Sequence, residues 1–250
     1  MKWIIDRKLL FFLHLCMVLT VRSQDHLIRY SCVFNDQFDR EEHYRYFNAE
    51  LHISGNSSYF FMTPDEHVPL SPQDPNAIYV RLDTLLRIAK LTDDHQLVFG
   101  DITISGKEKF YMDSLFPMQW ELVQEQRDMD SMHCSKAVAL FRGRRYICWY
   151  CPDIPLNDGP WKLGGLPGLI VEAYDEEENL HFRLLSWGSS PSLHIPIPMS
   201  GVLPDFEQYK RYWRDLSDQL QASMGITESS DCVACQTKSK IKIYLWEKVL

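Results

Sequence analysis

The sequence predicts a mainly β protein with minor α content: one large, strongly curved antiparallel sheet or half-barrel, with one helix from the C-terminal region packed on it. Two patterns lead to this fold class. Alternation of apolar and polar residues, which is typical of half-buried strands, recurs along most of the chain. Helical periodicity is sparse, and many strands in series with one late helix favour an antiparallel sheet with a helix against it.

The expected strands are separated by residues that form turns. Gly55-Asn56, Gly106-Lys107, Gly143 and the acidic run from Asp175 to Asn179 are typical of tight connections between antiparallel strands. A curved sheet of this kind could shelter an apolar ligand in its concave face, although the sequence does not separate a cavity from a filled core. The expected strands are residues 44–53, 58–62, 78–82, 96–105, 109–112, 119–123, 132–141, 144–150, 169–174, 180–187 and 241–246.

The expected helix is the segment PDFEQYKRYWRDLSDQLQASM, residues 204–224. Pro204 suits a first helical turn, and Gly225 can end the helix. Apolar side chains recur in it at helical spacing, which predicts that one face packs on the sheet. A second, shorter helix is expected at residues 84–91. The apolar residues of the longer helix are Phe206, Tyr209, Trp213, Leu216 and Leu220.

The N-terminus has the three parts of a secretory signal peptide. A basic start is followed by an apolar run over residues 9–21, and Ser23 precedes the expected cleavage site. The run is short for a transmembrane helix, and no later stretch is long enough to span a membrane. The sequence therefore predicts a signal peptide over residues 1–23, a single β-rich domain over residues 24–250, and a mature chain in the periplasm or cell envelope.

The charge of the chain excludes one class of partner. The 250 residues carry a formal net charge of −8, and removal of the signal peptide would leave −11. Such an acidic chain lacks the basic surface that nucleic-acid binding requires. Hydrophobic residues make up 45% of the chain, which is enough for one sizeable core. We therefore expect no nucleic-acid partner.

Two CxxC pairs stand among the six cysteines that would remain after export: Cys148 with Cys151, and Cys232 with Cys235. An even number of cysteines in an exported protein favours disulfides. Residues three apart on a strand point to opposite faces, so Cys148 and Cys151 can bond only if the chain turns at Tyr150. The alternatives are cross-links between the two pairs, or a zinc site of four thiolates.

The cysteines leave three chemical roles open. Structural disulfides fit export, and Cys32 with Cys134 is then the remaining bridge. Zinc is the cofactor that the two CxxC pairs would hold, although they lie much further apart in the sequence than in a compact zinc ribbon. Thioredoxin-like thiol exchange is disfavoured, because its CxxC pair begins a helix, whereas Cys148 precedes a proline-rich loop.

Residues 118–175 contain a recognisable motif. The letters GLPGLI stand at residues 165–170, after Gly159-Pro160-Trp161-Lys162 and the upstream Cys134-Ser135-Lys136-Ala137. This stretch resembles the GLPGLI family, also called Porph_ging, of exported proteins from Gram-negative bacteria. The family is defined by sequence without an established activity, so the resemblance implies export and fold rather than mechanism. The residues that carry it are Cys134, which matches a cysteine common in the family, with Gly159, Pro160, Gly165, Leu166, Pro167, Gly168, Leu169 and Ile170.

In physical terms the motif is mostly architectural. Its glycines permit positive φ and close backbone approach, and its prolines fix the direction of the chain. The expected structure is a strand over 144–150, an ordered loop over 151–168 and a strand over 169–174. This loop exceeds the usual connection length, and long ordered loops are often functional. We expect either a structural clamp or a loop that contacts a ligand or partner.

No spacing in the sequence marks a catalytic centre, a metal-binding histidine pair or a phosphate-binding loop. Asp153, Asp158 and Glu172 lie near the motif, but no pattern marks them as acid–base groups. We therefore expect an exported binding or accessory protein, whose partner is an apolar ligand, a peptide or an envelope protein. Some members of the GLPGLI family are encoded beside outer-membrane nutrient transporters, which suggests such a transporter system as the partner. The alternative is a metal-binding or thiol-redox envelope protein that uses the two CxxC pairs.

Overall fold

The computed structural model describes residues 24–38, 41–65, 86–91, 96–102, 108–114 and 118–190, together with 202–203 and a few residues between 205 and 219. The fold is mainly β, as the sequence predicts, and the described strands form one sheet. The strands are β1 (His26–Phe38), β2 (Glu41–Ser54), β3 (Ser57–Pro64), β4 (Leu86–Leu91), β5 (Gln96–Ile102), β6 (Glu108–Ser114), β7 (Glu121–Met129), β8 (Met132–Phe141), β9 (Arg144–Cys151), β10 (Leu169–Asp175), β11 (Leu180–Ser189) and β12 (Val202–Leu203).

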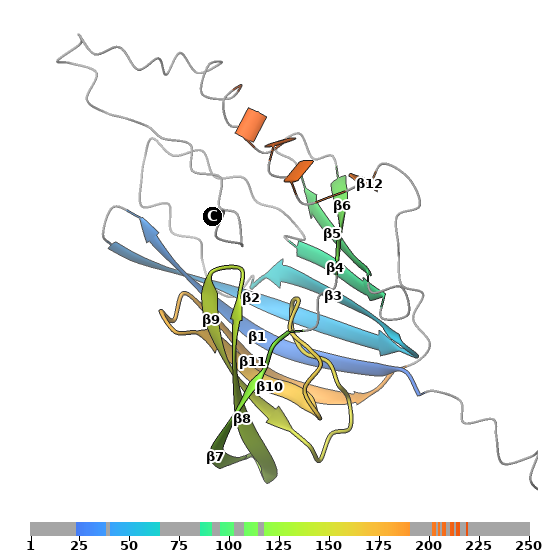
Figure 1. The fold of residues 1–250 in the computed structure, drawn as a ribbon, viewed down its shortest axis with the longest axis vertical. Helices are drawn as coiled ribbons and strands as arrows, with labels where there is room; N and C mark the ends of the chain where they lie inside the picture. Colours follow the sequence, from blue (N-terminus) through green and yellow to red (C-terminus); the bar gives the residue numbers. More distant parts are fainter. Residues whose placement is uncertain are drawn as a thin grey trace, which may run out of the picture.

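The sheet has the order β12-β6-β5-β4-β3-β2-β1-β11-β10-β9-β8-β7 and, within the described residues, is not closed. Neighbouring strands are antiparallel except for the short β12, which pairs with β6 in parallel. Two series of consecutive strands, β1–β6 and β7–β11, are joined by the pairing of β1 with β11. Figure 1 shows that the sheet is strongly twisted, with β7–β9 running steeply across the direction of β1–β3.

Strand β1 is a central strand that the sequence analysis missed. It pairs with β2 on one side and with β11 on the other. Ile28, Tyr30 and Cys32 are buried on one face, whereas Arg29 is exposed. This alternation along LIRYSC is the signal that could have found the strand.

Strand β4 corrects a second expectation, since residues 84–91 were predicted to form a short helix. Residues 86–91 instead form a strand that pairs with β3 and β5. The segment LRIAKL has apolar residues that fit both the helical and the strand period over so short a span. Hydrogen bonding to two neighbouring strands stabilises the extended conformation here, because tertiary contacts override a weak local preference.

The C-terminal helix is not confirmed, because most of residues 204–224 lie outside the described part of the chain. Only short helical pieces are described there, at residues 207–208, 211–212, 214–215 and 219. Tyr212 lies in one of them and packs against the core. No helix in the described part of the chain is long and apolar enough to cross a membrane. Other expectations that fall outside the described residues concern 1–23, 78–82, 241–246, Cys232 and Cys235.

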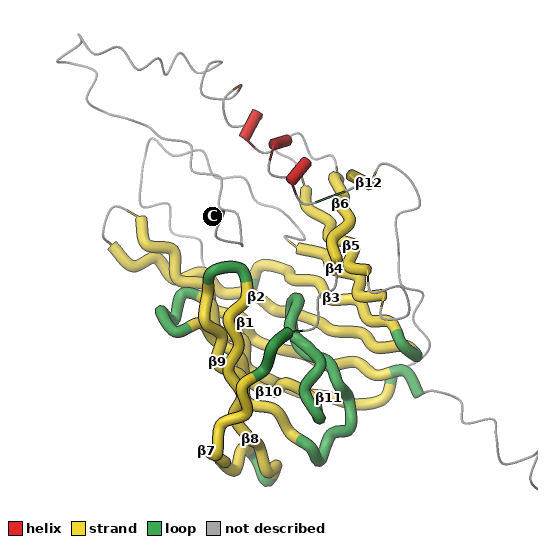
Figure 2. The backbone as a smooth tube through the Cα atoms, in the orientation of Figure 1, coloured by secondary structure: helices red, strands yellow, loops and turns green. Residues whose placement is uncertain are grey.

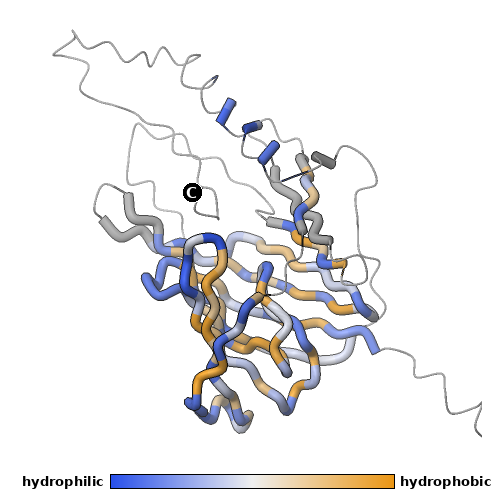
Figure 3. Tube along the Cα trace, viewed as in Figure 1, coloured by the Kyte–Doolittle hydropathy of each residue, from blue (hydrophilic) through white to orange (hydrophobic). Residues whose placement is uncertain are grey.

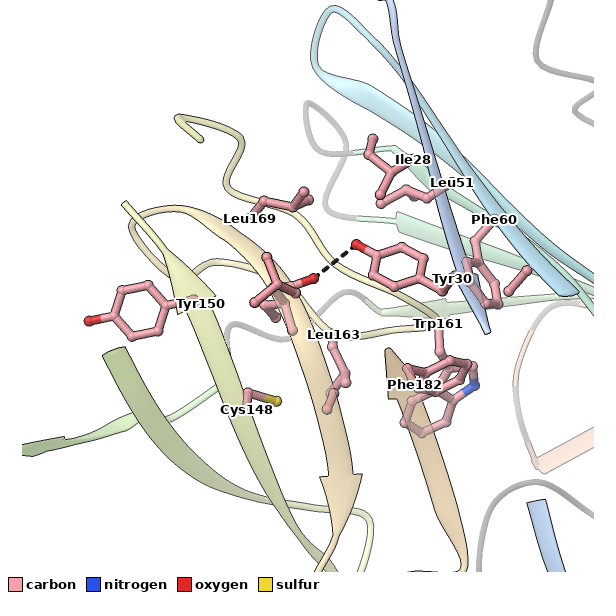
Figure 4. Close-up of a cluster of buried hydrophobic side chains, with 14 of the residues drawn as sticks. Ile28, Tyr30, Leu51, Phe60, Cys148, Tyr150, Trp161, Leu163, Leu169 and Phe182 are labelled. Carbon is pink, nitrogen blue, oxygen red and sulfur yellow. Dashed lines mark hydrogen bonds between the residues drawn. The ribbon is translucent and has the colours of Figure 1, made fainter. Parts of the chain in front are cut away.

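The core lies on the face of the sheet that carries Ile28, Tyr30 and Phe60, which we call the inner face. Side chains from the central strands and from the loop between β9 and β10 form one continuous apolar cluster (Figure 4). Figure 2 shows this loop as a long excursion beside β10, and Figure 3 shows apolar residues along the strands that it approaches. Trp161 and Leu163 of the loop are fully buried in the cluster. The chain therefore fills much of its inner face with its own loop.

A group of ion pairs lies on the outer face and links three strands through Glu172 of β10. The Glu172 carboxylate, only 4% exposed, accepts hydrogen bonds from Arg127 of β7 and from His181 Nε2 of β11, the latter at 2.9 Å. Arg183 Nη2 lies 3.7 Å from the same carboxylate. The Arg127 guanidinium also stacks on the Trp149 ring, with 4.1 Å between its Cζ and the ring centroid. The hydrogen bond from His181 lowers the pKa of Glu172, and the hydrogen bond and charge of Arg127 lower it further. Burial of the carboxylate raises this pKa, but the net result is a pKa of about 2.

This lowered pKa predicts a pH-dependent contribution of Glu172 to stability. The pKa in the folded state lies below the ordinary value of 4.5, so the contribution is full above about pH 4.5 and is lost as the pH falls towards 2. Replacing Glu172 by Gln should lower the free energy of unfolding by roughly 1–3 kcal/mol at pH 7, a range that allows for solvent screening of its partly exposed partners.

Urea unfolding of wild type and Glu172→Gln at pH 7, 5, 3.5 and 2.5 measures the difference. The two curves should converge as the pH falls. Glu125→Gln is the matched control, because Glu125 pairs with Lys136 at the surface and should change stability by less than about 1 kcal/mol. A difference between wild type and Glu172→Gln that stays constant from pH 7 to pH 2.5 would contradict this account.

Candidate functional site

The loop between β9 and β10, residues 152–168, is ordered by its own backbone hydrogen bonds, and we call it the motif loop. Ile154 N donates to Cys151 O at 3.1 Å, and Leu169 N donates to Ile154 O at 3.0 Å. Further along, Ile170 N donates to Asp158 O at 3.0 Å. These bonds tie the start of the loop to the beginning of β10. The expectation of an ordered loop between two strands is confirmed.

Two glycines of the motif occupy positions where a side chain does not fit. Gly168 has φ +147°, and a Cβ there would lie 2.2 Å from the Cys151 carbonyl oxygen. A Cβ on Gly159 would lie 2.8 Å from the Ile170 side chain. Of the other motif residues, Pro160, Leu166, Leu169 and Ile170 are buried, whereas Gly165 and Pro167 are exposed. The motif therefore combines close backbone approach with apolar anchors, as expected from its composition.

A buried lysine from β4 holds the middle of the motif loop. Lys90 Nζ donates to Asp158 Oδ1 at 2.5 Å and to the carbonyl oxygens of Gly159 and Leu163, both at 2.8 Å. The lysine side chain is 5% exposed. Burial lowers the pKa of Lys90, and the Asp158 carboxylate opposes this shift. All three donors of the ammonium group thus have acceptors on one loop, which we call the Lys90 clamp.

Aromatic side chains also hold the motif loop in place. Tyr30 Oη of β1 donates to the Ile170 carbonyl at 2.9 Å, the bond drawn in Figure 4. Trp161, with φ +55°, packs against Tyr146 and Phe141 with ring centroids 5.6 and 5.7 Å apart. Trp120 Nε1 donates to the Gly164 carbonyl at 2.9 Å from the other end of the loop. Side chains from β1, β8 and β9 and from the residue before β7 therefore hold the loop in place.

A polar surface hollow of about 250 Å³ lies where β7 and β8 meet the start of the motif loop. His133 Nδ1 hydrogen-bonds Asp128 Oδ1 at 2.5 Å, which raises the pKa of His133, and His133 N donates to Asp153 Oδ2 at 3.2 Å. Two aspartates, a histidine and a buried cysteine therefore line one hollow. It is lined by Gln126, Arg127, Asp128, His133, Cys134, Ser135, Pro152 and Asp153.

The cysteine that lies next to Cys151 in the structure is not one that the sequence spacing suggests. Cys134 Sγ lies 2.7 Å from Cys151 Sγ, so the structure brings a motif cysteine against one member of a CxxC pair. Cys148 is fully buried opposite Ala137 and Ala173, on the face opposite to Cys151 because three residues separate them along β9. None of the four cysteines in the described part of the chain is joined to another by a disulfide in the structure.

The bridge predicted between Cys32 and Cys134 is not formed, because three strands, β9, β10 and β11, separate β1 from β8. Cys148 and Cys151 point to opposite faces, so they do not meet as two ligands of one ion on β9. No three histidine, cysteine, aspartate or glutamate side chains among the described residues, including those that line the hollow, are arranged so that they could hold one metal ion. Cys232 and Cys235 lie outside that part of the chain, so a zinc site that uses both CxxC pairs stays a prediction.

The three carboxylates considered for acid–base chemistry have separate partners. Asp158 is held in the Lys90 clamp, and Glu172 is held by Arg127 and His181 on the outer face. Asp153 lies at the hollow and accepts from the backbone of His133. The structure therefore does not bring them together as a catalytic pair.

Sequence reasoning missed the residues that position this site, above all Lys90, Arg127 and Asp128. A lysine in LRIAKL is normally read as an exposed cation, and its partner Asp158 lies 68 residues away. Arg127 and Asp128 belong to the second half of β7, which extends beyond the strand predicted at 119–123. Only the high density of charges around residues 125–130 could have drawn attention to them.

The described fold and site define a class of protein: an open, twisted antiparallel sheet whose inner face is filled by a long glycine-containing motif loop. A sequence model of the family described as "Protein of unknown function (Porph_ging)" matches residues 143–172, which run from the turn before β9 through the motif loop into β10. The match confirms the predicted resemblance to the GLPGLI family over this segment. None of the curated proteins matches the sequence.

Solved structures show a likeness in fold. Two crystal forms of PNGF-II, in space groups C2 and P21, match with a TM-score of 0.52 at 13% and 14% sequence identity. The matches cover 76% and 77% of this chain but only 32% and 34% of PNGF-II, so the chain spans about a third of that protein. A DUF1329 family protein from Desulfovibrio piger matches at 11% identity, covering 75% of this chain and 94% of that one, with a TM-score of 0.27 that is too low to support an argument. At these identities the PNGF-II likeness concerns the fold alone.

The close approach at Gly168 predicts a strong effect of adding one methyl group. Gly168→Ala should lower the free energy of unfolding by about 3 kcal/mol, because the new Cβ meets the Cys151 carbonyl and the backbone conformation disfavours a side chain. Gly188→Ala is the matched control, since nothing lies within 4 Å of its Cβ position, and it should stay within about 1 kcal/mol of wild type. Equal effects of the two substitutions in urea unfolding would refute the steric argument.

The Lys90 clamp predicts that removal of the ammonium group destabilises the domain. Lys90→Met keeps the apolar stem but leaves the Asp158 carboxylate with the Gly159 amide and without its counter-charge, and it removes the Lys90 donor from two carbonyls. The free energy of unfolding should therefore fall by roughly 3–5 kcal/mol. Lys136→Met, which breaks a more exposed pair with Glu125, should cost less than about 1 kcal/mol. Chemical unfolding monitored by tryptophan fluorescence measures both values. A Lys90→Met protein as stable as Lys136→Met would show that the clamp is dispensable.

Proposed function

We propose that the protein is an exported binding or accessory protein of the cell envelope, which contacts a peptide or protein partner at the polar hollow beside β7. The observation that carries the proposal is the position of this hollow, at the meeting of the motif loop with the last two strands of the sheet. The segment matched by the family model, residues 143–172, would then contribute part of the recognition surface through Pro152 and Asp153. The proposed location rests on the predicted signal peptide.

The filled inner face favours a peptide or protein partner over an apolar ligand. Trp161, Leu163 and Leu166 occupy the space beside the central strands and are buried there. An apolar ligand beside them would have to displace this part of the motif loop and disrupt the Lys90 clamp. A partner at the outer hollow requires no such rearrangement.

The charges around the hollow suit a partner that donates hydrogen bonds. Asp128 and Asp153 present carboxylates there, whereas the Arg127 guanidinium is directed to Glu172 and Trp149. The acidic charge expected for the mature chain would favour encounter with a basic partner. We therefore propose that a lysine- or arginine-containing segment docks at the hollow.

Strand β7 offers backbone groups for the same interaction. It lies at the edge of the sheet formed by the described residues, and its side chains are mostly exposed, including Leu122 at 60%. An exposed edge strand can accept an extended peptide as an additional strand. Such a peptide would run past Gln126 and Asp128 at the rim of the hollow.

Thiol exchange is less well supported as a function. Burial raises the pKa of Cys134 and of Cys151, and their mutual contact raises that of Cys151 further. Exchange catalysis requires an accessible thiol with a lowered pKa. The described cysteines therefore fit a structural role better than a catalytic one.

Site-specific photo-crosslinking tests the proposed surface. A photo-crosslinking phenylalanine analogue at Gln126 should give an adduct of defined mass in the envelope of the cells that produce the protein. The same analogue at Glu177, an exposed position in the turn between β10 and β11, is the control and should give none. Asp128→Asn with Asp153→Asn should reduce the adduct at least tenfold, because a basic segment would lose its acceptors. No adduct from Gln126, or equal adducts from Gln126 and Glu177, would contradict the proposal.

A further inference from the structure

Cys134 and Cys151 form an isolated pair of thiols across two neighbouring strands. The register of β8 and β9 pairs Ser135 with Tyr150, and its continuation by one residue places Cys134 opposite Cys151. Their Sγ atoms lie 2.7 Å apart, and the two residues are 1% and 0% exposed. Each sulfur atom also lies near a backbone carbonyl: Met132 O is 3.7 Å from Cys134 Sγ, and His133 O is 3.5 Å from Cys151 Sγ.

The backbone of this pair suits a covalent bond. Directly opposite residues of antiparallel strands have Cα atoms about 4.5 or 5.5 Å apart, according to the type of pair. Disulfides occur at Cα separations of about 4.4–6.8 Å, so both types lie within the permitted range. No movement of the strands is required to join the two sulfur atoms.

The other described cysteines have no such partner. Cys32 lies opposite Phe47 of β2 and Phe182 of β11, and Cys148 lies opposite alanines on both neighbouring strands. The contact between Cys134 and Cys151 is therefore specific within the described part of the chain. It differs from every pairing that the sequence spacing suggests.

We propose that Cys134 and Cys151 form a disulfide when the protein meets a disulfide oxidant, and that this bond fixes the start of the motif loop. The thiolate of one cysteine attacks a sulfur of the oxidant's disulfide, which forms a mixed disulfide and releases one thiol of the oxidant. The second protein thiolate then displaces the other oxidant sulfur. Two protein thiols are thereby oxidised to one disulfide, and one oxidant disulfide is reduced to two thiols that take up the protons.

The position of the bond gives it a structural consequence. Cys151 is the last residue of β9, its carbonyl accepts from Ile154 N, and Gly168 packs against that carbonyl at the other end of the loop. A bond to Cys134 would therefore anchor both ends of the motif loop to β8. Cys134 also borders the hollow, but the inference does not depend on the proposed function, because it concerns only the covalent state of the chain.

Peptide mapping of protein secreted into an oxidising compartment tests the pairing. Thiols are alkylated before digestion, without reduction. Trypsin releases Cys134 in residues 128–136, but Cys148 and Cys151 share residues 146–162, so the Cys148→Ala variant is mapped in parallel. The expected result is a linked pair of these two peptides, two hydrogen atoms lighter than their sum, in both proteins. Alkylated Cys134, or a link from Cys134 to any cysteine other than Cys151, would overturn the inference.

Thermal unfolding provides a second measurement with its own control. It uses the Cys232→Ser/Cys235→Ser background, so that those two thiols do not contribute. Reduction should lower the Tm by roughly 6–12 °C, as expected for a cross-link closing a loop of this length in a domain of this size. The shift should disappear on addition of Cys134→Ser and Cys151→Ser but persist on addition of Cys32→Ala. A Tm that is insensitive to reduction in the background protein, or a shift that survives the loss of Cys134 and Cys151, would overturn the inference.

Discussion

A buried lysine, Lys90, holds the motif loop against the central strands of the sheet. A long loop placed inside a domain must find partners for its backbone groups, because unpaired buried carbonyls are costly. Lys90 meets this requirement with three donors directed at Asp158 and at the carbonyls of Gly159 and Leu163. The cost of removing an ammonium group from water is offset only where a carboxylate and further acceptors surround it, and the motif loop supplies all of them. Lysine and loop therefore stabilise each other, although 68 residues separate Lys90 from Asp158.

The two faces of the sheet carry different interactions. On the inner face, the held loop places Trp161, Leu163 and Leu166 in the core, where they take the space that a curved open sheet would otherwise offer to a ligand. On the outer face, Glu172 gathers Arg127 and His181 and connects β7, β10 and β11. The hollow lies at the rim between these regions, where the loop begins and the sheet reaches its β7 edge. Polar side chains therefore gather at this rim, where we propose that a partner binds.

Local sequence patterns predicted the hairpin strands well, and long-range contacts explain most of what they missed. Strands 132–141, 144–150 and 169–174 were recognisable because alternation and turn residues such as Gly143 act within a few positions. The Lys90 clamp, the pairing of β1 with β11 and the contact of Cys134 with Cys151 depend on register between distant segments, which spacing along the chain does not encode. Residues 84–91 are a further example. The apolar residues of LRIAKL fit the period of a helix and that of a strand, and only the pairing with β3 and β5 determines which one forms. The motif was identified from its sequence alone. The structure was needed to explain why residue 168 is a glycine, because the Cys151 carbonyl lies where a side chain would be.

Hydrogen exchange in wild type and Lys90→Met shows whether the lysine holds the motif loop, since it reports on individual loop amides rather than on global stability. The informative amides are those of Gly165, Leu169 and Ile170, which donate to carbonyls of the motif loop, and that of Ile154, which donates to the Cys151 carbonyl at the end of β9. The account predicts that these amides lose protection at least tenfold in Lys90→Met under native conditions, while amides shared by β8 and β9 remain protected. Unchanged protection of the four loop amides in a folded Lys90→Met protein would show that the loop is held without the lysine and would contradict the account.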